Sequence, residues 1–480
     1  MSEPISLVDA AVAIRAGRLE PVELLDRCLE QIRRHEDRIH AWVVVDEAGA
    51  RRTAAERGRQ AARGEFLGPL HGIPVGIKDI IDVEGLPTRA GSPLRRDHRA
   101  RADAPLVAAL RRAGAVILGK TVTVEFACFD PSPTRNPWNT AHTPGGSSSG
   151  SAAAVALNMC LGALGTQTGG SLVRPSTYCG IATCKPTFGR LPMEGIVPVS
   201  YHLDHPGPMA HTVADLALLL GCLLNPSGVP LHGVPLALPV RDVPVHGVPL
   251  ATPVHDLPSA DRPLRVDLSL PQPPRLGLLQ GSILEDAEPR ICAVTEMAVA
   301  RLRGGGAGID AIDLPDEFHD VPMYHRRIMA VEAAAYHRET FAGHRDQYGP
   351  MIAGLLDEGL GILGVDYAAA LAWQREFRGR AAALLVGVDA LVMPSTHTTA
   401  PATLDTTGTP RFQAPWSCAG LPVVSIPCGV ADDGMPAAIQ VIGRHDGEAE
   451  LLRVAAWCER QIGFRSRPPL PPGEGRGGGG

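Results

Sequence analysis

Two glycine-flanked serine clusters, close together in the sequence, restrict what this chain can fold into. The first reads Thr-Pro-Gly-Gly-Ser-Ser-Ser-Gly-Ser at residues 143–151, and the second reads Gly-Thr-Gln-Thr-Gly-Gly-Ser at residues 165–171. Glycine lets a backbone approach a ligand closely, and serine hydroxyls can donate, accept or attack. The second cluster predicts a loop whose successive N–H groups converge on an oxyanion. The pair therefore indicates a binding or catalytic site.

The Ala-rich residues 152–163 connect the clusters, and we expect them to form a helix capped by Ser149 or Ser151. Gly/Ser runs are more often flexible linkers than sites. Here, however, Arg-Pro, Cys-Gly and Lys-Pro-Thr follow the second cluster directly, at 174, 179 and 185. A linker is therefore a poor explanation for residues 143–187.

The composition excludes several classes of function. The chain has 480 residues, of which 45% are hydrophobic and 20% charged, as in a soluble globular protein. A net charge of −6 without any Lys/Arg block, and only 4% aromatic residues, argue against nucleic-acid binding. No apolar run reaches the roughly 18 residues of a membrane span, and no N-terminal leader is evident. We therefore expect a cytoplasmic protein without membrane or nucleic-acid partners.

The spacing of cysteine and histidine gives no sign of a metal site. The 10 cysteines contain no Cys-x-x-Cys pair, and the 17 histidines show no His-Glu-x-x-His pattern. Most cysteines lie among apolar residues and are expected to be buried. We expect neither a metal nor a cofactor.

A candidate base lies at the end of an expected strand. Apolar residues alternate in Ile-Pro-Val-Gly-Ile-Lys-Asp at residues 73–79, which predicts a strand that ends near Lys78. A lysine in this position usually reaches the surface or pairs with a carboxylate, here Asp79 or Asp82. Burial would instead favour the neutral amine and lower its pKa, which is what a general base needs.

Residues 114–121, Gly-Ala-Val-Ile-Leu-Gly-Lys-Thr, formally match a phosphate-binding loop. Such a loop must follow a strand and open a helix. Here residues 104–113 are expected to be helical, and Ala-Val-Ile-Leu reads as a strand in its own right. We therefore reject nucleotide binding.

Residues 146–150, Gly-Ser-Ser-Ser-Gly, also match the nucleophile elbow of α/β-hydrolases. That interpretation makes Ser148 the nucleophile and requires a downstream acid and histidine, such as Asp204 with His211. It explains neither the second Gly/Ser cluster nor Lys78, so we do not adopt it.

The chain resembles the amidase signature family in a long run of residues. The matching pattern is Gly-Gly-Ser-Ser-Ser-Gly-Ser-Ala-Ala-Ala-Val-Ala, then Gly-Thr-Gln-Thr-Gly-Gly-Ser, Cys-Gly and Lys-Pro-Thr-Phe-Gly-Arg. The Gly-Ile-Pro-Val-Gly-Ile-Lys-Asp pattern around Lys78 matches as well. The resemblance implies one large α/β domain with a central mixed β-sheet covered by helices. It also implies hydrolysis of a small-molecule amide to a carboxylate and ammonia or an amine.

The resemblance implies a role for each catalytic position. Ser171 becomes the nucleophile that forms an acyl-enzyme, Ser147 on a cis peptide bond becomes the proton relay, and Lys78 becomes the base. The oxyanion hole is implied to consist of backbone N–H groups, those of Thr168, Gly169, Gly170 and Ser171.

Two positions depart from the common family pattern. Gln167 stands where many members have Asp, and Arg174 lies three residues after Ser171, where many have Arg two residues after. Both resemble the malonamidase-like subgroup and count against the glutaminase-type subunit of a tRNA-dependent amidotransferase. Arg174 is a candidate for binding a substrate carboxylate or carbonyl, unless it pairs with a buried carboxylate that holds the loop. A catalytically inactive binding protein on this fold is a further alternative.

We assign residues 1–466 to the amidase domain and the Pro/Gly-rich residues 467–480 to a disordered tail. Residues 225–275 are expected to be a Pro-rich surface insertion, since His-Gly-Val-Pro-Leu-Ala recurs at 232 and 246, a period of 246 − 232 = 14. The resemblance offers no counterpart for this insertion. The sequence leaves the oligomeric state open, with a homodimer as one option.

Helical periodicity predicts helices within residues 5–65, from 213 to 224 behind a capping box at Thr212, after 279 through 385, and over 451–462. Buried strands are expected at 276–279, 389–395, 420–429 and 438–443.

Overall fold

The computed structural model describes residues 5–224 and 267–469 of the chain. The Pro-rich repeat of the expected insertion and residues 470–480 of the expected tail lie outside these residues. Within the described ranges, no helix is both long enough and apolar enough to span a bilayer.

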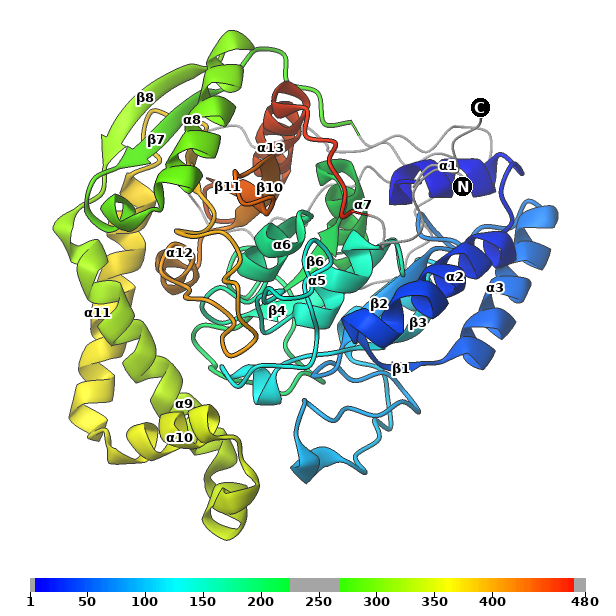
Figure 1. Ribbon diagram of the computed structural model, residues 1–480, viewed down its shortest axis with the longest axis horizontal. Coiled ribbons are helices and arrows are strands. Elements are labelled where there is room, and N and C mark those ends of the chain that lie inside the picture. Colours follow the sequence, from blue (N-terminus) through cyan, green and yellow to red (C-terminus); the bar gives the residue numbers. More distant parts are fainter. Residues whose placement is uncertain (1–4, 225–266, 470–480) are drawn as a thin grey trace.

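One mixed sheet of eleven strands forms the centre of the structure (Figure 1), with the order β1-β3-β2-β4-β6-β5-β10-β11-β9-β7-β8. β2 runs parallel to β3 and β4, β7 runs parallel to β8 and β9, and the other pairs are antiparallel. The α/β fold class implied by the resemblance is confirmed. The strands are β1 (Trp42–Val45), β2 (Pro74–Lys78), β3 (Val116–Thr121), β4 (Gly162–Gln167), β5 (Ala182–Lys185), β6 (His205–Ala210), β7 (Arg275–Gln280), β8 (Gly308–Asp313), β9 (Ala390–Pro394), β10 (Val423–Val430) and β11 (Pro436–Ile442).

Thirteen α-helices in the described residues accompany the sheet. Figure 1 shows the N-terminal helices α2 and α3 beside β1, β2 and β3, and α8 beside β7 and β8 at the other end. The helices are α1 (Leu7–Arg15), α2 (Pro21–Ile39), α3 (Glu47–Ala62), α4 (Pro105–Arg112), α5 (Ser149–Ala156), α6 (Val173–Cys179), α7 (Val213–Leu223), α8 (Pro289–Gly304), α9 (Val321–His344), α10 (Pro350–Gly361), α11 (Gly364–Ala383), α12 (Ala414–Ala419) and α13 (Glu448–Ile462).

Helices α9, α10 and α11 form an arm that extends from one side of the sheet (Figure 1). An aromatic cluster holds the base of this arm, because the fully buried ring of Phe318 lies 4.9 Å from that of Phe377 in α11 and 5.6 Å from that of Trp416 in α12. The same buried cluster contains Val173, two residues after Ser171. The base of the arm and α6, the helix that follows the second Gly/Ser cluster, therefore share one buried cluster.

Several local predictions are confirmed. β2 ends at Lys78, as the alternation predicted, and all five of its residues are buried between β3 and β4. Thr212 caps α7 by accepting a hydrogen bond from the N–H of Asp215, and β9 and α13 lie where the apolar patterns placed them. The rejected phosphate loop is strand β3 after helix α4.

The prediction of one helix over residues 152–163 is wrong. Helix α5 ends at Ala156, and residues from Gly162 onward belong to β4. Asn158 adopts a left-handed conformation (φ 55°), which asparagine tolerates and which stops the helix. Neither Ser149 nor Ser151 is the cap: the N-cap is Ser148, without a side-chain capping bond.

Two edge strands, β1 and β8, escaped the sequence analysis. β1 interrupts the predicted N-terminal helical region with Trp-Val-Val-Val and pairs antiparallel with β3. β8 pairs parallel with β7 at the opposite edge, within a stretch expected to be helical. Both strands are short and lie between helical segments. The helix propensity of the neighbouring residues therefore obscured the strand pattern.

Candidate active site

Lys78 and Ser147 form a buried pair at the end of β2. The Nζ atom of Lys78 donates to Ser147 Oγ at 2.7 Å and to Thr166 Oγ1 of the neighbouring β4 at 2.8 Å. Lys78 is fully buried, and no carboxylate of the described residues lies within ion-pair distance of it. The alternative that Lys78 reaches the surface or pairs with Asp79 is wrong, since Asp79 pairs with Lys120 at 2.9 Å.

Burial lowers the pKa of Lys78 to about 7, and the charge of Asp204 opposes this shift only in part. Removing a lysine from water disfavours its charged form, so the amine is neutral in a large share of molecules at neutral pH. A neutral amine on a serine hydroxyl can accept that hydroxyl's proton.

The serine side chains of the first cluster make different contacts. Ser147 faces Lys78, and the Gly146–Ser147 peptide bond is cis. Ser148 Oγ donates to the carbonyl oxygen of Thr166 at 3.2 Å and accepts from its N–H at 3.3 Å, so this serine connects the loop to β4. The nucleophile-elbow alternative fails on this geometry, because Ser148 is fully buried and lies outside the cavity that Ser147 and Ser171 line.

Ser171 lies in the loop between β4 and α6 and lines a cavity of about 510 Å³ together with Ser147. The loop residues Thr168, Gly169 and Gly170 line the same cavity. Within residues 5–224 and 267–469, the N–H groups of Gly169, Gly170 and Ser171 have no protein acceptor. Free N–H groups beside a hydroxyl are the arrangement that an oxyanion hole requires.

Gln167 shapes this loop from its start. Its Oε1 accepts from the N–H groups of Leu172 and Val173 at 2.9 and 3.0 Å, and its Nε2 donates to Ser417 Oγ at 3.0 Å. Ser417 Oγ in turn donates to the Gly169 carbonyl at 2.8 Å. The amide is suited to this position because it both accepts and donates, whereas an ionised carboxylate only accepts.

Arg174 is buried and also lines the cavity. Its Nη2 donates to the Gly146 carbonyl at 2.7 Å and to Thr407 Oγ1 at 3.3 Å, whereas Nε and Nη1 have no hydrogen-bond partner in the described residues. Burial lowers the pKa of Arg174 to about 10, so the guanidinium stays charged at neutral pH. The alternative that it pairs with a buried carboxylate is wrong, because its loop partner is the Gly146 carbonyl beside the cis peptide.

Apolar side chains form most of the remaining cavity wall, among them Phe129, Ile283, Phe318, Val321 and Met329. Two further arginines line the cavity, and each has an acidic partner: Arg326 pairs with Glu358 at 2.7 Å, and Arg411 pairs with Asp286. Arg174 is therefore the lining cation whose charge no carboxylate of the described residues balances.

The sequence analysis missed three residues whose side chains form hydrogen bonds with loop 168–171: Ser417, Asp204 and His325. Asp204 Oδ1 accepts from Thr168 Oγ1 at 2.6 Å, and His325 Nε2 donates to the Thr168 carbonyl at 3.0 Å. No local motif marks Ser417 or His325. Asp204 was considered only as the acid of a nucleophile elbow, and nothing around it in the sequence indicates a contact with the second Gly/Ser cluster.

Comparison with known proteins agrees with this geometry. A family model described as Amidase matches residues 23–452, most of the chain. The chain belongs to the amidase family. As a family member it is a hydrolase that acts on the C–N bonds of amides, and the activity implied by the resemblance is confirmed.

This amidase is 33% identical over 500 residues to one subunit of the glutamyl-tRNA(Gln) amidotransferase of Chloroflexus aggregans, in a match that covers 96% of this chain and 97% of that one. The native peptide amidase of Stenotrophomonas maltophilia superposes with a TM-score of 0.79 and 30% identity, covering 97% of this chain and 98% of that chain. A 6-aminohexanoate cyclic dimer hydrolase solved with its substrate gives 0.80 and 25%, covering 97% and 98%.

Proposed function

We propose that this amidase hydrolyses a small carboxamide through an acyl-enzyme on Ser171, with Ser147 as proton relay and Lys78 as base. The observation that carries the proposal is the hydrogen bond between the buried Lys78 amine, which has no carboxylate partner in the described residues, and Ser147 Oγ. Ser147 lines the same cavity as Ser171 and the loop residues whose N–H groups have no protein acceptor in the described residues.

In this mechanism Lys78 accepts the proton of Ser147, which accepts that of Ser171 as Ser171 Oγ bonds to the amide carbon. The carbonyl oxygen becomes an oxyanion held by the N–H groups of loop 168–171, each worth on the order of 3 kcal/mol. The C–N bond then breaks, and the proton returns through Ser147 to the leaving nitrogen. Water attacks the ester with the same relay as base, which releases the carboxylate and restores the Ser171 hydroxyl.

The proposal predicts a pH profile. Lys78 accepts a proton only when neutral, so kcat/KM should rise as the pH passes through about 7, falling roughly tenfold per pH unit below that value. A neutral amide without ionisable groups should be the substrate, so that the profile reports the enzyme alone. Activity that is flat between pH 5 and 9, or that declines toward alkaline pH, would exclude a lysine base with this pKa.

Arg174 predicts a preference for substrates that carry a carboxylate near the amide. Arg174 lines the cavity, two of its buried nitrogens have no hydrogen-bond partner in the described residues, and a guanidinium matches a carboxylate bidentately. Comparing an acid-bearing amide with its methyl ester in wild type and Arg174→Lys should show the preference reduced by about 1.5–3 kcal/mol in relative kcat/KM. An equal loss on both substrates would make Arg174 only the support of the Gly146 carbonyl.

The similarity to the amidotransferase subunit supports a second candidate, an enzyme that releases ammonia from glutamine within a complex. A third, an inactive binding protein, requires that the site lack activity altogether. The test is release of ammonia from a panel of simple amides by the purified protein alone. Release without a partner supports the independent amidase; activity that appears only when the other amidotransferase components are added supports the second candidate.

The cytoplasmic location, the homodimer and the domain limits at residue 466 stay predictions.

A further inference from the structure

The segment before β6 carries a buried carboxylate that reaches the catalytic loop. Asp204 accepts three hydrogen bonds: from Thr168 Oγ1 at 2.6 Å through Oδ1, and from the N–H groups of Val199 and Ser200 at 2.8 and 3.0 Å through Oδ2. Asp204 does not line the cavity and therefore touches no substrate there. Its hydrogen-bond contact with loop 168–171 is through Thr168.

The hydroxyl and the carbonyl of Thr168 each have a hydrogen-bond partner. The hydroxyl is fixed by Asp204, and the carbonyl accepts from His325 Nε2 at 3.0 Å. Burial lowers the pKa of His325, so its ring is neutral, and Nε2 must carry the hydrogen because its partner is a carbonyl oxygen. Fixing the Thr168 carbonyl also fixes the peptide plane that contains the N–H of Gly169.

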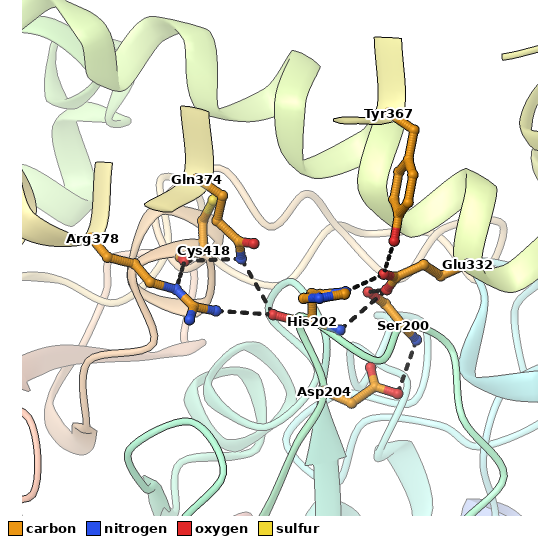
Figure 2. A network of polar contacts seen from close by, with 8 residues as sticks. All are labelled: Ser200, His202, Asp204, Glu332, Tyr367, Gln374, Arg378 and Cys418. Carbon is orange, nitrogen blue, oxygen red and sulfur yellow. Dashed lines mark hydrogen bonds and ion pairs between the residues drawn. The ribbon is translucent and has the colours of Figure 1, made fainter. Parts of the chain in front are cut away.

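Helix α9 holds the segment that carries Asp204. Glu332 accepts from the N–H of His202 at 3.1 Å, and it also accepts from Ser200 Oγ and His202 Nδ1 (Figure 2). Tyr367 OH donates to the same carboxylate at 2.6 Å. Figure 2 shows Asp204 directly below this network, joined to it through Ser200.

Helix α11 adds two donors to the same segment. Gln374 Nε2 and Arg378 Nη2 donate to the carbonyl of His202 at 3.2 and 3.3 Å, and both side chains also reach the carbonyl of Cys418 (Figure 2). Residues 199–204 are thus fixed on the arm side by donors and acceptors from two helices.

His325 and Glu332 lie seven residues apart in α9, about two turns, and therefore on one face of the helix. One residue holds the Thr168 carbonyl directly, and the other holds the segment that fixes the Thr168 hydroxyl. Val321 and Met329 of the same helix line the cavity. A single helix thus contacts both the substrate space and the loop expected to stabilise the oxyanion.

We propose that Asp204 is a positioning residue for loop 168–171, and that Glu332 acts through it by holding residues 199–204 in place. The inference rests on the proposed function, since it concerns the geometry of the same oxyanion site. It assigns the network in Figure 2 a role in kcat, although none of its members lines the cavity.

The charge of Asp204 supplies a readout that a purely structural role would not move. The titratable groups that act on Lys78 are Asp204, from the segment before β6, and Cys128, from the segment after β3. Burial raises the pKa of the Cys128 thiol well above its usual range, so this thiol is neutral and the charge that raises the pKa of Lys78 is that of Asp204. Burial raises the pKa of Asp204 to about 6, so the carboxylate is ionised through most of the working range. Removing its charge should lower the pKa of Lys78 and move the acid limb of the rate profile to lower pH.

The experiment compares Asp204→Asn, Glu332→Gln and the double variant on a neutral amide. An asparagine can keep the bonds from Val199 and Ser200 through its oxygen, but it then presents an amide donor to Thr168. We expect kcat of Asp204→Asn to fall about 10- to 100-fold with KM changed far less, because a small displacement of the oxyanion donors acts on the transition state. Glu332→Gln should lower kcat less, without moving the pH profile.

The double variant separates a chain of contacts from two independent supports. If Glu332 acts through Asp204, the double variant should lose less than the product of the two single losses. A loss equal to that product would overturn the role assigned to Glu332.

Asp215→Asn is the matched control. Asp215 is also a buried aspartate whose pKa burial raises to about 6, but its partner is the N–H of Val8, far from the cavity lining. This variant should keep the wild-type kcat and pH profile. The same behaviour in Asp204→Asn would overturn the proposal.

If Asp204→Asn does not fold, two variants of Thr168 test the proposal instead. Thr168→Val should lose far more of kcat than Thr168→Ser, which keeps the hydroxyl that Asp204 accepts from; an equal loss in both overturns the proposal. Labelling of wild type at Ser171 by a fluorophosphonate separates the two levels of inference. If the wild type is labelled and active and the variants keep its kcat, only the role of Asp204 is refuted. If the wild type is neither labelled nor active, the proposed function is refuted, and this inference with it.

Discussion

Ser171→Ala should abolish the acyl-enzyme and lower kcat for amide hydrolysis by about 10⁴-fold or more, as removal of a serine nucleophile does in other acyl-transfer enzymes. Ser148 cannot take its place, because its hydroxyl is bonded to the backbone of Thr166 and it does not line the cavity. Ammonia release under single-turnover and steady-state conditions measures the loss.

The matched control is Ser149→Ala, in the first serine cluster. Ser149 is fully buried, pairs with Ser132 Oγ at 2.8 Å and does not line the cavity. It should keep wild-type turnover. Turnover close to wild type in Ser171→Ala, or a loss as large in Ser149→Ala, would refute the assignment of the nucleophile.

Lys78→Met should remove nearly all activity and, at neutral pH, make the protein more stable. The pKa of Lys78 is lower in the folded chain, about 7, than its usual value of 10.5, so folding requires the amine to lose its proton. This cost is absent above pH 10.5, grows as the pH falls toward 7 and is constant below that value. Methionine relieves a cost of several kcal/mol, offset in part by the lost hydrogen bonds to Ser147 and Thr166.

Urea unfolding of wild type and Lys78→Met at pH 7 and pH 10 measures the effect. The stability advantage of the variant should be larger at pH 7. Lys185→Met provides the control, since burial lowers the pKa of Lys185 to about 7 as well, and its amine donates to the carbonyl of Leu421 at 2.6 Å. Lys185 does not line the cavity, so its variant should share the pH dependence of stability and keep activity. A stability difference independent of pH would contradict a neutral Lys78.

Local signals in the sequence predicted the strand that ends at Lys78 and the start of α7. Alternation located β2 and placed Lys78 at its end, and the capping residues of α7 marked where that helix begins. The error over residues 152–163 arose because alanine favours a helix until a left-handed residue stops it, and Asn158 gives only a weak sign of that. Composition could not show that edge strands β1 and β8 would find partners in a sheet assembled from distant segments.

The resemblance supplied the roles proposed for Lys78, Ser147 and Ser171. It could not supply the support of the loop. Gln167 reaches Ser417, 250 residues away, and Thr168 reaches His325, 157 residues away, so these contacts exist only once the arm has packed. The alternative of a carboxylate partner for Arg174 was wrong, since its loop partner is the carbonyl of Gly146.

The most direct test of the central claim is to react the purified protein with a fluorophosphonate and to map the adduct by mass spectrometry while following ammonia release. The account predicts one adduct, on Ser171, with residual activity falling in proportion to its formation. It also predicts no adduct in Ser171→Ala and a much slower reaction in Lys78→Met. An adduct on another serine that abolishes activity, or full ammonia release from protein labelled completely at Ser171, would contradict it.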